Sequence, residues 1–137
     1  MLGQILFASL LITGALSVIS LLAPYILSTP SPLVVVMSRS MEPAFRPGDL
    51  LVVKGLQSCA PDVGDVVVYR SRKHGRRIVH RVIEVEQSSG EVLLLTKGDA
   101  VKIPDGEPVE MEDLLGSVLW RVRWLGLPLY FLWHARL

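Results

Sequence analysis

The sequence predicts a mostly β domain of antiparallel strands that follows an N-terminal transmembrane helix. Two observations support this fold class. An apolar run occupies residues 5–26, and no Lys, Arg, Asp or Glu occurs before Arg39. From residue 33 on, short runs rich in Val and Leu alternate with Gly, Pro and Ser turns, and no long helical periodicity competes with them. A chain of 137 residues fits one domain with a core of moderate size.

The apolar run is long enough to cross a bilayer. Its 22 or so residues would form a helix about 33 Å long, and its polar members are hydroxyls that can bond back to their own helix. Pro24 lies near the end of the run, where it terminates a helix rather than breaking its middle. A cleaved secretory signal is the competing interpretation. It is disfavoured because no Lys or Arg precedes the run and because the run is long.

The β domain is expected between residues 33 and 122. Strands are predicted at 33–36, 50–53, 66–69, 78–86, 92–96 and 118–122, with turns at Gly48-Asp49 and at residues 88–90. The basic run RSRKHGRR at 70–77 is interpreted as a solvated hairpin tip, with anionic lipid or nucleic acid as the alternative ligand. A formal net charge of +1 gives no general attraction to nucleic acid, and none is expected as a partner.

Residues 123–137 are apolar and rich in aromatic side chains. We interpret them as a segment at the membrane interface or a shortened second anchor, with packing in the core as the alternative. Residues 1–28 would be the transmembrane anchor. The single cysteine, Cys59, cannot form an internal disulfide, and no Cys/His cluster has the spacing of a zinc site.

An acyl-transfer site is the chemistry that the polar residues suggest. Ser40 lies where the chain leaves a predicted strand, and His80 is a base embedded among apolar residues of another. Asp99 and Asp105, in KGDAVKIPDG, are carboxylates that could orient the imidazole. The other histidines, at 74 and 134, lie in the basic run and in the aromatic tail, where surface roles are expected. Spacing alone does not establish a serine hydrolase.

The motifs together resemble those of the signal peptidase I family over nearly the whole chain. SRSMEPAFRPGDLLVV (38–53) is similar to the Ser-Met-x-Pro box of that family and the strand behind it. GDVVVY (64–69), HRVIEV (80–85) and KGDAVKIPDG (97–106) follow in the order of the family. A histidine stands where the usual bacterial branch has a lysine. The chain therefore resembles the archaeal and endoplasmic-reticulum branch, which uses serine, histidine and aspartate.

The resemblance implies a signal-peptidase-like β fold and a serine endopeptidase that removes signal peptides from secreted preproteins. Ser40 would be the nucleophile and His80 the general base, and either Asp99 or Asp105 would orient His80. The Ser40 N–H, helped by the Ser38 hydroxyl, would form the oxyanion hole. No metal or cofactor is implied. The preprotein, the lipid bilayer and other signal peptidase subunits are the partners that it suggests.

The resemblance also bears on orientation in the membrane. It implies the cell membrane or the endoplasmic reticulum, with the catalytic domain on the extracytoplasmic or lumenal side. Arg39 and Arg46, which follow the apolar run, indicate the opposite orientation under the positive-inside rule. We follow the functional argument, because whole domains are translocated largely regardless of charge.

Three rival interpretations stay open. A serine–lysine protein of similar fold would need Lys73 or Lys97 as its base. An inactive anchored β module, or a partner subunit of a signal peptidase complex, would need no catalytic residues. A membrane-surface module would act through the basic run at 70–77.

Overall fold

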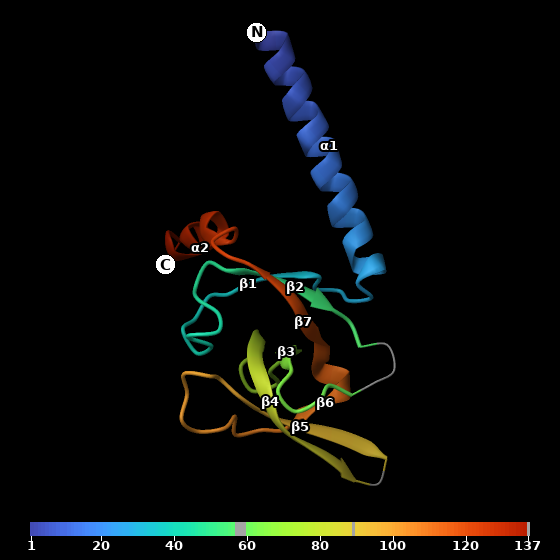
Figure 1. Ribbon diagram of the computed structural model, residues 1–137, viewed down its shortest axis with the longest axis vertical. Coiled ribbons are helices and arrows are strands. Elements are labelled where there is room, and N and C mark those ends of the chain that lie inside the picture. The colour runs from blue at the N-terminus through green and yellow to red at the C-terminus, as the bar shows by residue number, and fades with distance from the viewer. Residues whose placement is uncertain (57–59, 89, 137) are drawn as a thin grey trace.

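The chain forms a long helix that projects from a β domain (Figure 1). The structure is a computed structural model that describes residues 1–56, 60–88 and 90–136. Cys59 and the middle of the predicted turn at 88–90 lie outside the described residues. The predicted fold class, a mostly antiparallel β domain after an apolar N-terminal helix, is confirmed.

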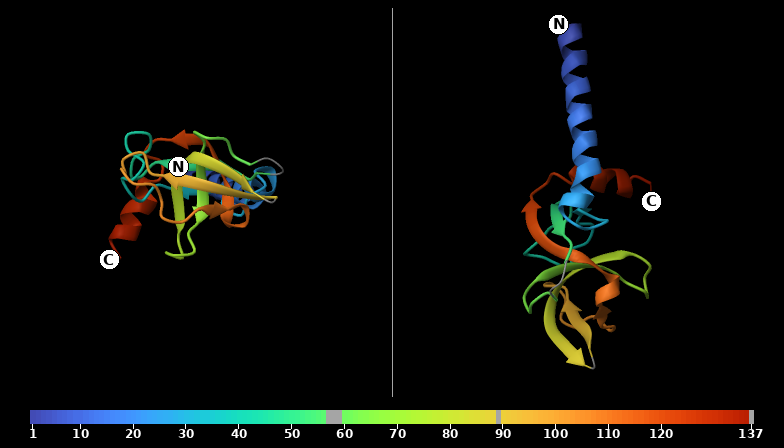
Figure 2. Two further views of the ribbon diagram at one scale, coloured as in Figure 1. Left: turned by 90° about the horizontal axis from the view of Figure 1, so that it is seen from below. Right: turned by 90° about the vertical axis from the view of Figure 1, so that its right-hand side faces the viewer.

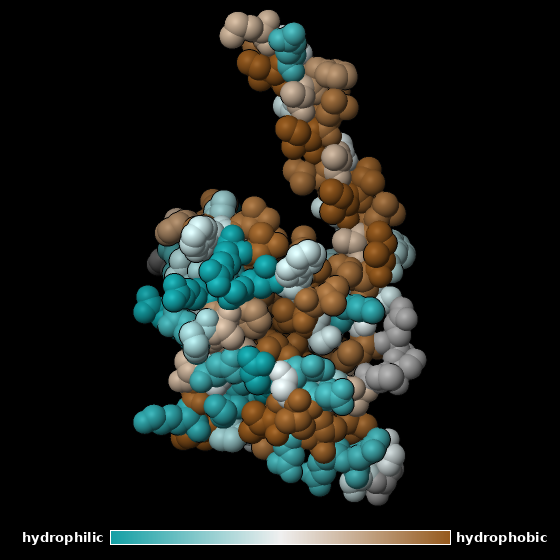
Figure 3. Space-filling model, viewed as in Figure 1, coloured by the Kyte–Doolittle hydropathy of each residue, from teal (hydrophilic) through white to brown (hydrophobic). Residues whose placement is uncertain are grey.

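Helix α1 (Leu2–Ile26) has the length and composition of a membrane span. It has 25 residues, and its most apolar stretch has a mean hydropathy of 2.4 with none of its surface buried in the protein. Hydroxyls on successive turns donate to backbone carbonyls of the same helix; those of Ser9, Thr13 and Ser17 do so. Apolar side chains therefore face outward along the helix, as the space-filling view shows (Figure 3).

One antiparallel sheet organises the rest of the chain. In the described residues its strand order is β1-β2-β7-β3-β4-β5-β6, which leaves β1 and β6 at the two edges. The strands are β1 (Leu33–Val35), β2 (Leu50–Lys54), β3 (Val66–Arg70), β4 (Arg77–Ser88), β5 (Glu91–Lys97), β6 (Val109–Glu110) and β7 (Leu114–Val122). Figure 2 shows how strongly these strands coil around one another.

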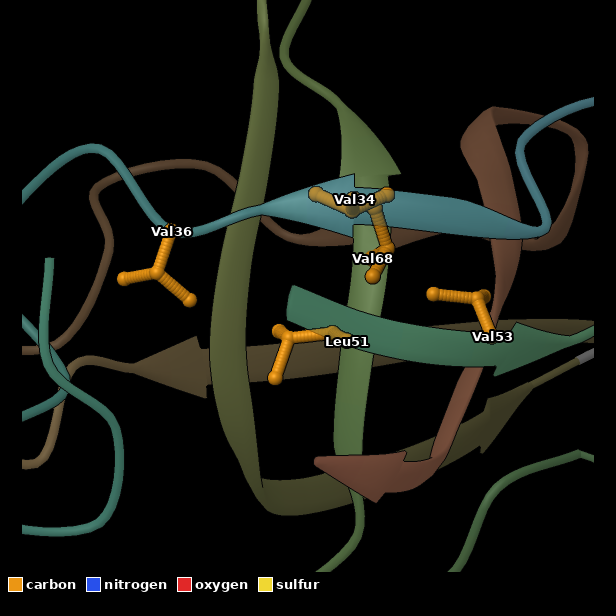
Figure 4. Close-up of a cluster of buried hydrophobic side chains, with 5 residues drawn as sticks. All are labelled: Val34, Val36, Leu51, Val53 and Val68. Carbon is orange, nitrogen blue, oxygen red and sulfur yellow. The ribbon is translucent and has the colours of Figure 1, made fainter. Parts of the chain in front are cut away.

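Two clusters of buried side chains form the core, one on each face of β3. The first contains Val34, Val36, Leu51, Val53 and Val68 (Figure 4). The second contains Val67, Tyr69, Val82, Leu94 and Val109. Successive side chains of a strand point to opposite faces, so Val67 and Val68 of β3 enter different clusters. This explains why β3 is a continuous apolar run rather than an alternating one.

The strands predicted at 33–36, 50–53, 66–69, 78–86 and 92–96 are all present within about two residues. The prediction for 118–122 found only the second half of β7, which begins at Leu114. β6 and the 3₁₀ turn Met111–Asp113 were not predicted. β6 has two residues, so it carries no periodic pattern from which a strand could be recognised.

The basic run forms the tip of the β3–β4 hairpin, as expected. Its turn is closed by the Ser71 N–H, which donates to the carbonyl of Arg76 over 3.0 Å. Arg72 at this tip contacts three carboxylates, those of Glu110, Glu112 and Asp113. Those three carboxylates lie close enough to hold a cation, but the guanidinium already occupies the space between them.

The C-terminal segment ends in the short helix α2 (Leu127–His134), which has no buried residue. Its start is tied to the turn before β2, because the Gly126 N–H donates to the Gly48 carbonyl over 2.9 Å. Both α2 and the C-terminal end of α1 lie at the same end of the β domain (Figures 1 and 2). At eight residues, α2 would be about 12 Å long, too short to cross a bilayer.

Candidate active site

Ser40 lies in the turn that follows β1, and buried neighbours fix its position. The next side chain, Met41, is 1% exposed and inserts into the core, while Ser40 itself is half-buried. The Phe45 N–H donates to the Met41 carbonyl and the Glu42 N–H to the Arg39 carbonyl, at 2.9 and 3.1 Å. The turn therefore holds the Ser40 hydroxyl at the edge of the sheet, where a partner can reach it.

His80 lies in the first half of β4, directly opposite Val67 of β3. Its Nε2 is 3.2 Å from the Ser40 Oγ, and its Nδ1 is 2.6 Å from Oδ2 of Asp105. The side chain of His80 is only 11% exposed and that of Asp105 24%. Serine, imidazole and carboxylate thus form one hydrogen-bonded chain, which links three segments of the sequence.

Asp105 receives two further hydrogen bonds on the same oxygen. The Tyr69 hydroxyl donates to Oδ2 over 3.0 Å, and the Thr96 hydroxyl over 2.6 Å. The Asp105 N–H donates to the Thr96 carbonyl over 2.8 Å, so its backbone is fixed as well. Burial raises the pKa of the Tyr69 hydroxyl, and the adjacent Asp105 charge acts in the same direction. Tyr69 therefore remains a hydrogen-bond donor at neutral pH.

Gly98 allows the loop after β5 to approach the serine. A Cβ at this position would lie 2.6 Å from the Ser40 carbonyl oxygen and 3.0 Å from His80 Nε2. The same loop donates the Ala100 N–H to the Ser40 carbonyl over 2.9 Å. A side chain here would collide with the backbone of Ser40, so the close approach requires glycine.

Asp99 faces a different partner. Its two carboxylate oxygens accept from the Arg81 guanidinium at 2.9 and 2.7 Å, and Arg81 also donates to the Gly64 carbonyl over 2.7 Å. The hydrogen bond from Arg81 holds the pKa of Asp99 below its usual range. Of the two aspartates that the sequence left open, Asp105 contacts His80, and Asp99 joins the β4 strand to the loop.

Two polar groups lie beside the Ser40 hydroxyl. The Ser38 Oγ is 3.1 Å from the Ser40 Oγ. Among the described residues, the Ser40 N–H donates to no protein acceptor. A free N–H and a neighbouring hydroxyl are the groups that an oxyanion requires.

The remaining histidines and lysines with a suggested role lie elsewhere. His74 is exposed in the hairpin turn, and the Nδ1 of His134 in α2 is 3.0 Å from the Tyr130 carbonyl. The Lys97 ammonium donates to the carbonyls of Gly98 and Val101. Within the described part of the chain, Lys97 makes no hydrogen bond to Ser40, and the base beside the serine is a histidine.

This arrangement matches a serine nucleophile with an adjacent base and an oriented carboxylate. A comparison with protein families agrees, because the model of "Signal peptidase, peptidase S26" matches residues 6–114. The chain belongs to this family. The match includes most of α1 and the segments that supply Ser40, His80 and Asp105.

Relatives in this signal peptidase family share about two fifths of the aligned residues. The signal peptidase complex catalytic subunit SEC11 of Verticillium alfalfae is 37% identical over 132 residues, which cover 90% of this chain and 73% of the relative. SEC11 of Pyricularia oryzae is 38% identical, over 72% of this chain and 62% of its own length. SEC11C of Canis lupus familiaris is 45% identical, over 55% of this chain and 40% of its own length.

Three residues of the site were not predicted from the sequence. Tyr69 and Thr96 end apolar runs of predicted strands, and Arg81 follows His80 directly, so the local pattern does not single them out. A signal existed for Thr96, a hydroxyl at the end of a continuous apolar run, where burial would require a hydrogen-bonding partner. Its bonding partner lies nine residues away along a loop, so the sequence could not identify it.

Proposed function

We propose that this chain is a membrane-anchored serine endopeptidase that removes signal peptides from preproteins. Ser40 is the nucleophile, His80 the general base, and Asp105 the carboxylate that orients His80. The hydrogen-bonded chain from Ser40 through His80 to Asp105 carries this proposal. The printed names of the SEC11 relatives support the substrate class.

Acylation begins when the Ser40 Oγ attacks the carbonyl carbon of the scissile peptide bond. His80 Nε2 takes the hydroxyl proton, and the imidazolium is stabilised by the Asp105 carboxylate at Nδ1. The protonated Nε2 then donates to the leaving amine as the C–N bond breaks. In the second half, a water molecule loses its proton to His80 and attacks the acyl-enzyme, and the proton returns to Ser40 as the ester bond breaks.

The oxyanion would be held by the Ser40 N–H together with the Ser38 hydroxyl. The free N–H and the position of the Ser38 Oγ beside the nucleophile support this assignment. Removal of one such donor typically costs about 10²–10³ in kcat. Ser38→Ala should therefore lower kcat while leaving the fold intact, since Ser38 is exposed.

The substrate would bind as an extended strand along residues 33–38. β1 is an edge strand of the sheet in the described residues, so its outer edge can accept main-chain hydrogen bonds from a peptide. The chain runs directly from this edge to Ser40. As the family resemblance implies, small residues at the first and third positions before the cut would fit shallow apolar pockets.

The membrane would supply proximity between enzyme and substrate. α1 would span the bilayer, with the β domain on the extracytoplasmic or lumenal side, where signal-peptide cleavage sites are presented. We propose that the C-terminal segment lies on the bilayer surface. Trp124 and Trp133 are 67% and 62% exposed, and no acidic residue follows Asp113, which suits an anionic headgroup region.

Partner subunits are part of the proposal. The relatives are named as catalytic subunits of a signal peptidase complex, and the chain would work in the same kind of assembly. An inactive module is the alternative function. The Ser40–His80–Asp105 hydrogen bonds favour the enzyme over it.

The test is cleavage of a model preprotein by the full chain in detergent or liposomes. Ser40→Ala and His80→Ala should abolish cleavage after a small residue, whereas His74→Ala, at the exposed hairpin tip, should cut like the wild type. Cleavage by Ser40→Ala at the wild-type rate would refute the nucleophile assignment. If the wild type is inactive alone but active with subunits captured from membranes, the complex is required. Chelators should leave the rate unchanged.

A further inference from the structure

Two buried hydroxyls beside Asp105 are not needed for the proton transfers described above. Tyr69 on β3 is 5% exposed and Thr96 on β5 is fully buried. Both donate to Oδ2, the carboxylate oxygen that also contacts His80 Nδ1. Three donors from three strands thus converge on one oxygen.

We propose that Tyr69 and Thr96 are positioning residues that fix the Asp105 carboxylate, and through it the His80 imidazole, for proton transfer from Ser40. This inference rests on the proposed function. Asp105 lies in the loop between β5 and β6, where its side chain is partly exposed and could otherwise rotate. The two hydroxyls, by contrast, are held by strands of the core.

The hydrogen bonds leave few alternatives for the carboxylate. Thr96 has one hydroxyl hydrogen, and its contact with Asp105 at 2.6 Å is much shorter than its 3.4 Å contact with the Tyr69 oxygen. The hydrogen of Thr96 therefore points at Oδ2. Tyr69 and Thr96 therefore hold Oδ2 at the position where it also contacts Nδ1 of His80. A fixed acceptor at Nδ1 keeps the proton there and leaves the Nε2 lone pair facing Ser40.

The donors also share the negative charge of Asp105. Both are neutral hydroxyl donors, so they hold the carboxylate without placing a second positive charge beside the imidazolium. Asp99 also interacts with His80, but it is paired with Arg81 and lies near Lys97 as well. If one hydroxyl is removed, the remaining hydroxyl still holds the carboxylate, but the negative charge of Asp105 is then stabilised by one neutral donor fewer. The imidazolium is then more stable, and the acid limb of the pH profile moves to higher pH.

The experiment uses Tyr69→Phe, Thr96→Val and Thr96→Ser in the full chain in detergent. Thr29→Val is the matched control, because Thr29 is also buried and its hydroxyl donates to a backbone carbonyl, that of Leu115, at 2.7 Å. Each variant is assayed for kcat, KM and pH profile, and the His80 ring is titrated by NMR. Loss of a hydrogen bond to a charged group should lower kcat roughly tenfold or more with little change in KM.

The inference predicts that Thr96→Val and Tyr69→Phe lower kcat and shift the His80 titration upward. Thr96→Ser should restore both values, and Thr29→Val should change neither. Wild-type kcat and titration in Thr96→Val and Tyr69→Phe would overturn the inference. So would a Thr96→Ser variant that behaves like Thr96→Val, since the methyl group would then be the cause. The NMR titration needs no substrate, so it tests the positioning even if Ser40→Ala shows that the proposed cleavage does not depend on Ser40.

Discussion

The two aspartates of KGDAVKIPDG offer a matched pair of substitutions. Asp105→Asn and Asp99→Asn make the same chemical change in one loop, six positions apart. Asp105 contacts His80 and Asp99 contacts Arg81. Asp105→Asn should therefore impair catalysis with the fold preserved, whereas Asp99→Asn should mainly lower stability.

The magnitude for Asp105→Asn follows from its surroundings. The Tyr69 and Thr96 hydroxyls require an acceptor at the position of Oδ2, so the new amide will place its oxygen there. The Nδ1–H tautomer of His80 is then retained and only the charge is lost. Opposite charges about 4 Å apart interact by about 4 kcal/mol at an effective dielectric constant of 20. The loss should therefore reach up to about 10³-fold in kcat.

Asp99→Asn should change kcat less than about tenfold, because Asp99 is hydrogen-bonded to Arg81 and Asp105 is the carboxylate bonded to the imidazole. It removes half of a bidentate pair whose side chains are 35% and 19% exposed. The expected loss is about 1 kcal/mol of unfolding free energy. The assays are preprotein cleavage and denaturant unfolding of the same samples. An Asp99→Asn variant that is folded yet as inactive as Asp105→Asn would refute the assignment of roles.

Three further predictions follow from single contacts. The pKa of Asp99 is lowered from its ordinary value of 3.8, so its contribution to stability is present above that pH and is lost on further acidification. The unfolding free energies of the wild type and of Asp99→Asn should therefore converge at low pH, which acid-unfolding curves would measure. Gly98→Ala should lower the unfolding free energy by about 1–3 kcal/mol and remove most of the activity, because the new Cβ meets the Ser40 backbone. Gly106→Ala is the control, because a Cβ there has open space. Thermal unfolding and cleavage assays of both variants test this. Asp49→Ala should lower the unfolding free energy by about 1–3 kcal/mol, measured by thermal unfolding. The Asp49 side chain belongs to a residue that is 2% exposed, and it accepts hydrogen bonds from two backbone N–H groups.

Much of the fold follows from local sequence signals. The apolar run before Arg39 predicts α1, and the Val-rich runs predict five of the strands, because burial on one or both faces leaves a periodic pattern. β6 and the start of β7 left no such pattern. Their residues pair because β5 and β3 present free edges to them, which is a property of the tertiary structure.

The sequence analysis named the candidate reactive residues of the site, but it did not name the residues that hold them in place. Ser40 and His80 were identified by chemistry and by family resemblance, and the structure brings them within hydrogen-bonding distance. The choice between Asp99 and Asp105 depended on where a loop folds back, which spacing cannot predict. The contacts favour Asp105, because the Arg81 guanidinium binds Asp99, whereas Asp105 contacts the histidine.

The geometry of the proposed triad depends on β3, although β3 supplies none of its three residues. Ser40 follows the segment that contributes Val34 and Val36 to the first core cluster. Asp105 is held by Tyr69 and Thr96, which belong to or adjoin the second. β3 contributes to both clusters, and its pairing with β4 places His80 opposite Val67, on the face of the second cluster. A change in the packing of β3 would therefore alter the distance between the Ser40 hydroxyl and His80 even where the domain stays folded. For the same loss of unfolding free energy, substitutions at Val67 and Val68 should therefore lower activity more than equivalent substitutions in β5.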